Sequence, residues 1–288
     1  MTLDKKLHKL EAILKEYDKI LVALSGGVDS AFLLAFARKT LGADNVSAIT
    51  ACGPHLAKDE VEYAAGLCHD LGVDHETLNM DHVLPIIEHN PPDRCYLCKK
   101  EIFFLMNEKA AASGKVLVDG TNLDDMDDYR PGHKALKELD VKSPLKDSGL
   151  TKSDIRTALK ILTEEKTYTS AKDPDYKSAL TLKTGMPIWE KPALACLASR
   201  IPYGESITVE KLSAIYKAEI FLRDLGFPQV RVRHHGDIAR LEVLPKDRRK
   251  FFDEGFMDMV NDHIKGLGFK YAVLDLGGYS MGGGYHVR

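Results

Sequence analysis

The sequence predicts an α/β fold: a doubly wound parallel sheet followed by a smaller C-terminal α/β domain. Over the first half of the chain, short apolar runs alternate with helical patterns. This alternation is typical of βαβ units, in which helices cover both faces of a parallel sheet. From about residue 206 a shorter series of helix and strand patterns follows, so we expect a second domain.

Apolar runs predict four strands in the first domain, at residues 20–24, 46–51, 77–80 and 116–118. Amphipathic patterns predict helices at residues 3–16, 30–41, 57–71 and 97–113. Gly42, Gly72 and Gly114 follow the last three of these helices. Glycine readily adopts the left-handed conformation that ends a helix, which supports these boundaries.

The pattern changes in the second half of the chain. A helix is predicted at 152–162, with Thr151 as its N-cap. Residues 163–186 are polar and without a clear period, so they are expected to form an exposed insertion. Beyond them we expect helices at 209–225 and 247–266 and strands at 230–233, 241–243 and 271–276.

The composition is that of an ordinary globular protein, with 288 residues, 44% of them hydrophobic, and a net charge of −3. This charge offers no general attraction for nucleic acid or an anionic membrane, so neither partner is expected. The first residues lack an apolar signal core, and no apolar run approaches the ~18 residues of a membrane helix, which predicts a cytoplasmic protein. In that reducing compartment the five cysteines are expected to be core residues, ligands or nucleophiles.

A glycine-rich turn joins the first predicted strand to the next helix, and it reads Ser25-Gly26-Gly27-Val28-Asp29-Ser30. Its two glycines allow the backbone to approach an anion, and the helix N-terminus directs N–H groups and a positive dipole toward it. The serine hydroxyls add donors, and the aspartate is suited to hold Mg²⁺. A strand-to-helix turn without a ligand is the alternative, but the narrow pattern favours a phosphate site.

The turn resembles the signature of the PP-loop pyrophosphatases, which cleave ATP between its α and β phosphates. The resemblance implies that the loop holds the leaving pyrophosphate of ATP. The loop lacks the Gly-Lys-Ser/Thr ending of a Walker A motif, which argues against γ-phosphate transfer. At the end of a later strand, Gly120-Thr121-Asn122 matches the adenylate-binding segment of these proteins, so Gly120 and Thr121 are candidate nucleotide ligands.

Three cysteines stand apart from the core patterns. Cys95 and Cys98 are one turn apart at a predicted helix start, among basic residues that favour the thiolate, and Cys196 lies in Pro192–Arg200. A structural zinc site would need a fourth ligand, which has no counterpart at motif spacing. Three thiolates suit a [4Fe–4S] cluster with one open iron. Core packing and a redox dithiol remain alternatives for these three; Cys68 and Cys52 are expected to pack.

Five segments together resemble the LarE family of ATP-dependent sulfur transferases: the loop, residues 93–100, 120–132, 196–204 and 230–242. The resemblance covers nearly the whole chain except residues 163–186. It implies adenylylation of a carboxylate of pyridinium-3,5-biscarboxylic acid mononucleotide, release of pyrophosphate and replacement of AMP by sulfur, on the way to the nickel-pincer nucleotide of lactate racemase. Some members sacrifice a cysteine sulfur; others carry a [4Fe–4S] cluster, and Cys95 with Cys98 indicates the second type.

The resemblance also assigns roles to residues of this sequence. It implies that Arg231 and Arg233 bind substrate or product phosphate, that Glu219 and Glu242 also lie at the site, and that Asp29, Ser30 and Cys196 are catalytic. Cys95, Cys98 and Cys196 would hold the cluster, and ATP and Mg²⁺ would bind at the loop. Beyond the resemblance, Arg200 and Ser199 are further candidates because they lie beside Cys196, Arg200 as a catalytic residue and Ser199 as a phosphate ligand. Asp127 and Asp128 are Mg²⁺ candidates, with an exposed acidic loop as the equal alternative. Without the resemblance, the two strand arginines could equally form a solvated face.

The same resemblance predicts a domain organisation and partners. Residues 1–162 would form the ATP pyrophosphatase domain, and residues 187–288 the substrate, sulfur-transfer and oligomerisation domain. The partners would be the small-molecule substrate, sulfide or another sulfur donor, and five further copies in a homohexamer. Three other functions remain as alternatives: a tRNA 2-thiolation enzyme, an ammonia-using synthetase such as NAD synthetase, and a non-catalytic adenine-nucleotide sensor.

Overall fold

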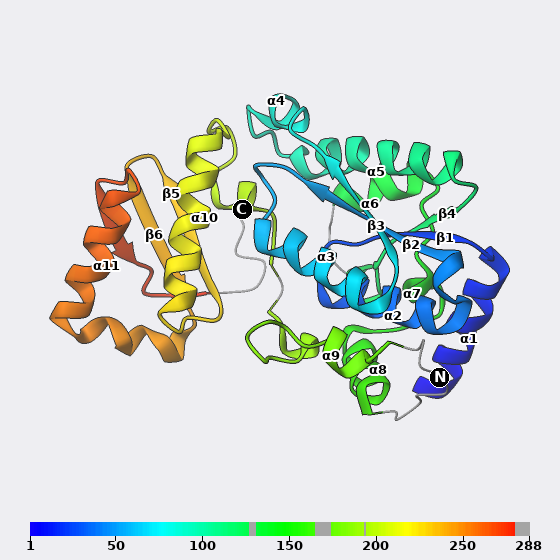
Figure 1. Ribbon diagram of the computed structural model, residues 1–288. Coiled ribbons are helices and arrows are strands. Elements are labelled where there is room, and N and C mark those ends of the chain that lie inside the picture. The colour runs from blue at the N-terminus through cyan, green and yellow to red at the C-terminus, as the bar shows by residue number, and fades with distance from the viewer. Residues whose placement is uncertain (127–130, 165–173, 193, 280–288) are drawn as a thin grey trace. The chain divides into compact units, whose positions relative to one another are not determined.

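The computed structural model describes residues 1–126, 131–164, 174–192 and 194–279 (Figure 1). Within these ranges the chain folds into two compact units that are interleaved in the sequence. The first unit comprises Met1–Gly53, Lys58–Asp81 and Cys95–Ala193. The second comprises Pro54–Ala57, His82–Arg94 and Leu194–Arg288. Two short stretches of the first half of the chain therefore belong to the C-terminal unit.

The first unit is built on a four-stranded parallel sheet in the order β3-β2-β1-β4. Its strands are β1 (Ile20–Ala23), β2 (Val46–Cys52), β3 (Asp74–Asn79) and β4 (Val116–Val118). The predicted strands are confirmed, but β3 begins three residues before the expected run. It is an edge strand whose side chains are mostly exposed, so its first residues carry no apolar signal.

Helices flank this sheet, which confirms the predicted α/β class. Figure 1 shows α5 (Arg94–Ala112) on one face and α2 (Val28–Leu41) and α3 (Lys58–Leu71) on the other. Gly42, Gly72 and Gly114 all have a positive φ, as predicted for residues that end helices. The remaining elements of this unit are α1 (Leu3–Tyr17), η1 (Ala43–Asn45), η2 (Leu123–Met126), α6 (Pro131–Glu138), α7 (Pro144–Asp147), α8 (Lys152–Glu164), α9 (Tyr176–Ala179) and η3 (Ile188–Glu190).

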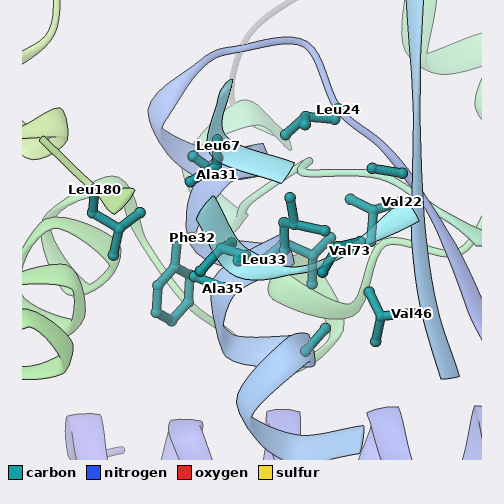
Figure 2. Close-up of a cluster of buried hydrophobic side chains, with 14 of the residues drawn as sticks. Val22, Leu24, Ala31, Phe32, Leu33, Ala35, Val46, Leu67, Val73 and Leu180 are labelled. Carbon is teal, nitrogen blue, oxygen red and sulfur yellow. The ribbon is translucent and has the colours of Figure 1, made fainter. Parts of the chain in front are cut away.

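The main core lies between the sheet and α2. Figure 2 shows side chains from β1 and α2, among them Val22, Phe32 and Leu33, packed against residues of other elements of the unit. Cys68 is fully buried in this cluster, which confirms its expected role in the core. Burial raises the pKa of its thiol to about 12, so it stays protonated and unreactive.

The helix predicted at 152–162 is present as α8, with its cap at Thr151 as expected. The Thr151 side chain accepts a hydrogen bond from the Asp154 amide at 3.2 Å, and the Asp154 side chain accepts one from the Thr151 amide at 3.0 Å, which forms a reciprocal cap at the start of α8.

The insertion predicted at 163–186 is described in part. Residues 165–173 lie outside the described part of the chain. Residues 174–186, predicted as exposed, contain α9 and bury Ala179 and Leu180 in the main core. The short α9 lacks a helical period long enough to be recognised.

The second unit contains a three-stranded sheet in the order β5-β6-β7, with β5 (Val230–His235), β6 (Ile238–Val243) and β7 (Tyr271–Leu274). The hairpin β5-β6 is antiparallel, and β6 and β7 are parallel. Helix α10 (Val209–Asp224) packs on β5. Short elements α4 (Val83–Ile87) and η4 (Leu197–Arg200) complete this part of the fold.

The helix predicted at 247–266 was wrong in extent. The structure has a 3₁₀ segment, η5 (Pro245–Phe252), and a separate helix, α11 (Glu254–Gly266). Asp253 is extended between them, and its carboxylate accepts a hydrogen bond from the Phe256 amide at 2.8 Å. This N-cap starts a new helix and explains the break. No helix among the described residues has the length and apolar character needed to cross a membrane.

Candidate active site

The predicted phosphate loop lies between β1 and α2. Gly27 is the N-cap residue of α2. The Ser25 amide donates to Ser30 Oγ at 3.2 Å, and that hydroxyl donates to the Gly27 carbonyl at 3.2 Å. These bonds close the loop upon itself, while the first N–H groups of a helix have no partner within it. The loop therefore has the local structure expected of an anion site.

Gly26 can be replaced by no other residue without movement of its surroundings. Its φ is +77°, and a Cβ atom there would lie 2.6 Å from the carbonyl oxygen of Glu60. A left-handed conformation is costly for any residue with a Cβ, and the contact with α3 adds a clash with backbone. The loop is thus seated directly on the start of α3.

The second predicted nucleotide segment meets this loop. Gly120 follows β4, and a Cβ atom there would lie 2.9 Å from the Ser30 amide nitrogen. Thr121 donates its hydroxyl hydrogen to Asp119, which also accepts from the Ser143 hydroxyl at 2.6 Å. The two segments stand at the carboxyl ends of the neighbouring strands β1 and β4, where ligands of such sheets bind.

Two carboxylates lie beside the loop, Asp125 buried and Asp29 half-buried. Asp29 accepts a hydrogen bond from Asn122 Nδ2 at 3.1 Å. Burial, reinforced by the negative charge of Asp125, raises the pKa of Asp29 to about 6. Lys152 partly balances this charge, with its Nζ 3.0 Å from Asp125 Oδ1. Carboxylate oxygens that repel each other in a buried site suit a divalent cation such as Mg²⁺.

Asp125 was not among the Mg²⁺ ligands predicted from the sequence. The predicted candidates, Asp127 and Asp128, lie outside the described residues. The acidic run after Asn122 was the signal, but spacing alone could not indicate which carboxylate turns inward. The Oδ1 atom of Asn122 is buried and has no hydrogen-bond partner among the described residues, and such an unsatisfied acceptor points to a ligand.

The three singled-out cysteines have free thiols, and none of them is fully buried. Cys95 and Cys98 lie in the first turn of α5, in the first unit; Cys196 precedes η4, in the second unit. Its Sγ donates to the His55 carbonyl at 3.2 Å. Among the described residues, no group of three or more side chains of the kind that bind metals stands together.

A buried arginine connects two segments of the second unit. Arg94 donates from Nη1 to the Ala198 carbonyl at 2.9 Å, and it also donates to the side chain of Asn90. Asn90 in turn donates to the carbonyl of Ile201 at 3.1 Å. These bonds hold residues 90–94 against η4 within this unit.

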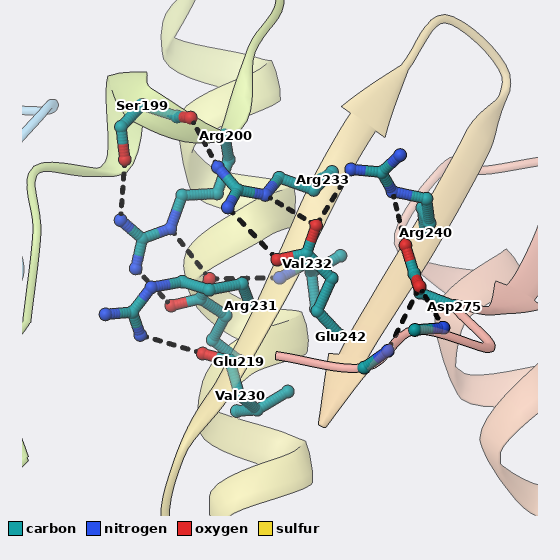
Figure 3. Close-up of polar contacts among 12 residues, drawn as sticks. Ser199, Arg200, Glu219, Val230, Arg231, Val232, Arg233, Arg240, Glu242 and Asp275 are labelled. Atoms are coloured by element: carbon teal, nitrogen blue, oxygen red, sulfur yellow. Dashed lines mark hydrogen bonds and ion pairs between the residues drawn. The ribbon is translucent and has the colours of Figure 1, made fainter. Parts of the chain in front are cut away.

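The second unit holds a buried network of arginines and glutamates (Figure 3). Arg200 forms a two-pronged ion pair with Glu219, with N–O distances of 2.8 and 2.9 Å. Arg233 forms another with Glu242, with both distances 3.0 Å. Only 1% of Arg200 and 4% of Arg233 are exposed. Such planar, paired geometry is the strongest form of carboxylate recognition by arginine.

Ser199 and Arg231 complete this network. The Ser199 hydroxyl accepts from Arg200 at 2.9 Å, and its carbonyl accepts from Arg233 at 2.9 Å. Arg231 lies over the ring of Tyr279, and burial together with the charge of Arg200 lowers its pKa. Because Arg231 is only 5% exposed and Arg233 4%, the alternative of a solvated strand face is wrong.

The network gathers several arginines in a largely buried setting. Arg200, Arg231 and Arg233 are all at most 5% exposed, and Figure 3 shows them with Glu219 and Glu242. The charge of Arg200 and burial both lower the pKa of Arg231. Arginine guanidinium groups are well suited to bind an anionic group such as a phosphate monoester.

Similarity to known proteins agrees with both sites. The family model of NAD synthase matches residues 3–119. A pyridinium-3,5-bisthiocarboxylic acid mononucleotide synthase of Lactiplantibacillus plantarum is 37% identical over 283 residues, which cover 98% of this chain and 94% of that protein. The chain belongs to the LarE family.

Other similar proteins match this chain either over its whole length or only locally. An uncharacterised protein of Synechocystis is 38% identical over 282 residues, which cover 97% of both chains. A glutamine-dependent NAD(+) synthetase of Xylella fastidiosa is 43% identical, but over 67 residues that make up 12% of its length. The likeness to NAD synthetases is therefore local. As a LarE-family member with a PP-loop, this chain is an ATP-using enzyme, and the alternative of a non-catalytic nucleotide sensor is wrong.

Proposed function

We propose that this enzyme is an ATP-dependent sulfur transferase that converts pyridinium-3,5-biscarboxylic acid mononucleotide to its thiocarboxylate, for the nickel-pincer nucleotide of lactate racemase. The observation that carries the proposal is the similarity, over nearly the whole length of both chains, to a synthase named for the bisthiocarboxylic product. The loop at residues 25–30 and the buried arginine network support it, because the reaction needs one site for ATP and one for an anionic mononucleotide.

The first half-reaction activates a carboxylate. A carboxylate oxygen of the substrate attacks the α-phosphorus of ATP, and the bond to the bridging oxygen breaks, releasing pyrophosphate. Asp29 and Asp125 would hold Mg²⁺, with Gly120 and Thr121 near the adenylate. Ser25 and Ser30 would donate to the pyrophosphate. In the second half-reaction sulfur attacks the acyl carbon, and AMP departs with the carboxylate oxygen, since adenylylation makes that oxygen a good leaving group.

The second unit would bind the phosphate of the mononucleotide. Arg231 and Arg233 are buried on neighbouring positions of β5, with Arg200 and Ser199 beside them. The burial of Arg200, Arg231 and Arg233 close together, where the charge of Arg200 lowers the pKa of Arg231, supports the assignment. Glu219 and Glu242 would hold two of these arginines in fixed orientations, which lowers the entropy lost when the phosphate binds.

We also propose that Cys95, Cys98 and Cys196 hold a [4Fe–4S] cluster. The residue types fit such a group, because thiolates are the usual ligands of iron–sulfur clusters. None of the three cysteines forms a disulfide, and none is fully buried, unlike Cys68. A bound cluster would supply the sulfur for transfer, replenished by sulfide or another sulfur donor. The predicted homohexamer stays a prediction.

The test is direct assay of both half-reactions. Purified enzyme would be incubated with ATP, Mg²⁺, sulfide and the biscarboxylic mononucleotide. We expect pyrophosphate and AMP in equal amounts and a product in which sulfur replaces one oxygen, detected by mass spectrometry. Pyrophosphate release that does not depend on the mononucleotide, or formation of an amide when ammonia is supplied, would contradict the proposal.

A further inference from the structure

A buried lysine stands against the phosphate loop. Lys191 lies just after η3 in the first unit and is 8% exposed. Its Nζ donates to the Gly26 carbonyl at 2.7 Å and lies 2.8 Å from Glu60 Oε1. The same nitrogen lies 4.5 Å from the centre of the Tyr63 ring. The ammonium group is thus held from three directions.

The surroundings hold this lysine in place. Glu60 is its ion-pair partner from α3, and the face of Tyr63 offers a cation–π contact. Burial, with the charge of Glu60, raises the pKa of Tyr63, so the ring stays neutral. An ammonium group is costly to bury unless it is paired, and here the pairing fixes it on one backbone oxygen of the loop.

That oxygen determines the direction of a neighbouring N–H group. In a trans peptide the C=O and the following N–H point in opposite directions. Because the Gly26 carbonyl faces the buried Lys191, the Gly27 N–H must face the other way. It donates a hydrogen bond to the hydroxyl of Ser25 at 3.4 Å, and Ser25 is exposed. The N–H is thus directed toward an exposed side chain, from whose direction an anion would approach.

Two successive glycines would otherwise leave this peptide free to rotate. Gly26 has φ +77° and Gly27 has φ −78°, and a half-turn of the peptide between them would invert the sign of φ at Gly27. Glycine alone tolerates both signs at little cost. The rotated peptide would present a carbonyl oxygen to the bound anion instead of an N–H, and the two would repel each other.

We propose that Lys191 is a positioning residue that locks the Gly26–Gly27 peptide so that the Gly27 N–H faces the pyrophosphate portion of ATP. The inference rests on the proposed role of this loop in binding pyrophosphate. It gives Lys191 a role that does not require contact between its side chain and the nucleotide. It also explains why the lysine binds a loop carbonyl, whereas a direct phosphate ligand would be directed into the site.

The experiment compares ligands that differ in their phosphates. Lys191→Met keeps the length of the side chain and removes the donor. By calorimetry we expect affinities for ATP and for inorganic pyrophosphate to fall about tenfold or more, while affinity for AMP, which lacks the pyrophosphate, changes less than about twofold. Lys191→Arg retains a cationic donor and should recover part of the loss.

Lys250 provides a matched control. Its Nζ donates to the Gly226 carbonyl at 2.7 Å, lies 4.6 Å from the centre of the Phe227 ring and 3.3 Å from Asp247, all in the second unit. Lys250→Met removes the same kind of contact far from the loop in sequence. It should leave the affinities for all three ligands unchanged.

Two results would overturn the inference while leaving the proposed function standing. The first is unchanged ATP and pyrophosphate affinity in Lys191→Met. The second is an equal loss for ATP, pyrophosphate and AMP with a lower melting temperature, which indicates a purely structural role. If wild-type enzyme itself fails to bind pyrophosphate, the proposed role of the loop fails, and the inference fails with it.

Discussion

At the scale of single residues, Asp29 combines an expected function with a cost to the fold. Burial and the neighbouring Asp125 raise its pKa from 3.8 to about 6. Each pKa unit corresponds to about 1.4 kcal/mol, so ionising this carboxyl in the folded protein costs up to about 3 kcal/mol. A raised folded pKa means that the cost is absent well below pH 3.8, grows as pH rises from 3.8 to about 6, and is complete above that. A cation bound to Asp29 would offset it.

The Asp29→Asn variant should therefore lose activity and gain stability. Without a charge to bury, its melting temperature should exceed that of the ligand-free wild type at pH 8, and the difference should become small near pH 4. Release of pyrophosphate should be abolished, because the amide is a poor ligand for Mg²⁺. Melting curves at the two pH values and a pyrophosphate assay check this.

Asp154 is the matched control for Asp29. Burial raises the pKa of its carboxyl, but hydrogen bonds from Lys6 and Thr151 outweigh that effect and lower it. Asp154→Asn should thus destabilise the protein at pH 8, with the difference shrinking as pH falls below 3.8. If both variants shifted the melting temperature in the same direction, the account of Asp29 would be wrong.

At the scale of elements, the β1–α2 loop depends on how closely it approaches α3. Gly26→Ala combines a positive φ with a Cβ 2.6 Å from a backbone oxygen, whereas Gly42 at the other end of α2 has φ +84° and open space around it. Gly42→Ala should cost about 1–2 kcal/mol of stability and leave ATP binding intact. Gly26→Ala should abolish ATP binding. Calorimetry with ATP and melting curves check both; equal ATP affinities in the two variants would contradict this.

The edge of the second sheet depends on the arginine network. Glu219, on α10, accepts from the Val232 amide of the edge strand β5 at 3.0 Å and pairs with Arg200. Removing either partner leaves the other buried and unpaired, which costs about 3–5 kcal/mol. We therefore expect Arg200→Met and Glu219→Met each to lower the urea midpoint of unfolding strongly. The double variant should lose less free energy of unfolding than the two single variants added together.

Urea denaturation of the four members of this cycle measures the coupling. The exposed pair Lys270–Asp237, at 2.8 Å in the same unit, is the control, and Lys270→Met should leave the transition unchanged. If the losses of unfolding free energy in the two single variants simply added up in the double variant, Arg200 and Glu219 would not be energetically coupled.

At the scale of the whole molecule, the sequence predicts strands and helices well where periodicity is strong and poorly where backbone contacts decide. The apolar runs of β1, β2 and β4 and the glycines after the helices identified the main sheet, and narrow motifs identified the loop. Nothing in the sequence indicated that residues 82–94 join the C-terminal unit. They do so through bonds such as the Gly204 amide to the Asn90 carbonyl at 3.0 Å and the Ile207 amide to the Glu88 carbonyl at 2.8 Å.

The same limit applies to the candidate sites. Lys191 could not be predicted, because its partners Gly26 and Glu60 are distant in sequence and no motif marks a lysine that binds a carbonyl. The pairing of Arg200 with Glu219 and of Arg233 with Glu242 likewise depends on how η4, α10 and the β5–β6 hairpin fold together. Motifs in the sequence identified most of the candidate site residues. Their hydrogen-bond and ion-pair partners became known only from the folded structure.

The last prediction concerns the source of the sulfur that is transferred. If Cys95, Cys98 and Cys196 hold a [4Fe–4S] cluster, protein purified without oxygen should be brown and contain about four irons per chain. Each single Cys→Ala variant at these positions should lose the iron, whereas Cys52→Ala, a half-buried free thiol at the end of β2, should keep it. In the competing account Cys196 gives up its own sulfur. Iron-free protein that loses one sulfur at Cys196 on turnover, with full activity in a Cys95→Ala/Cys98→Ala variant, would establish that account instead. Iron analysis and mass spectrometry of the intact chain before and after turnover separate the two, because a replenished sulfur leaves the mass of the chain unchanged.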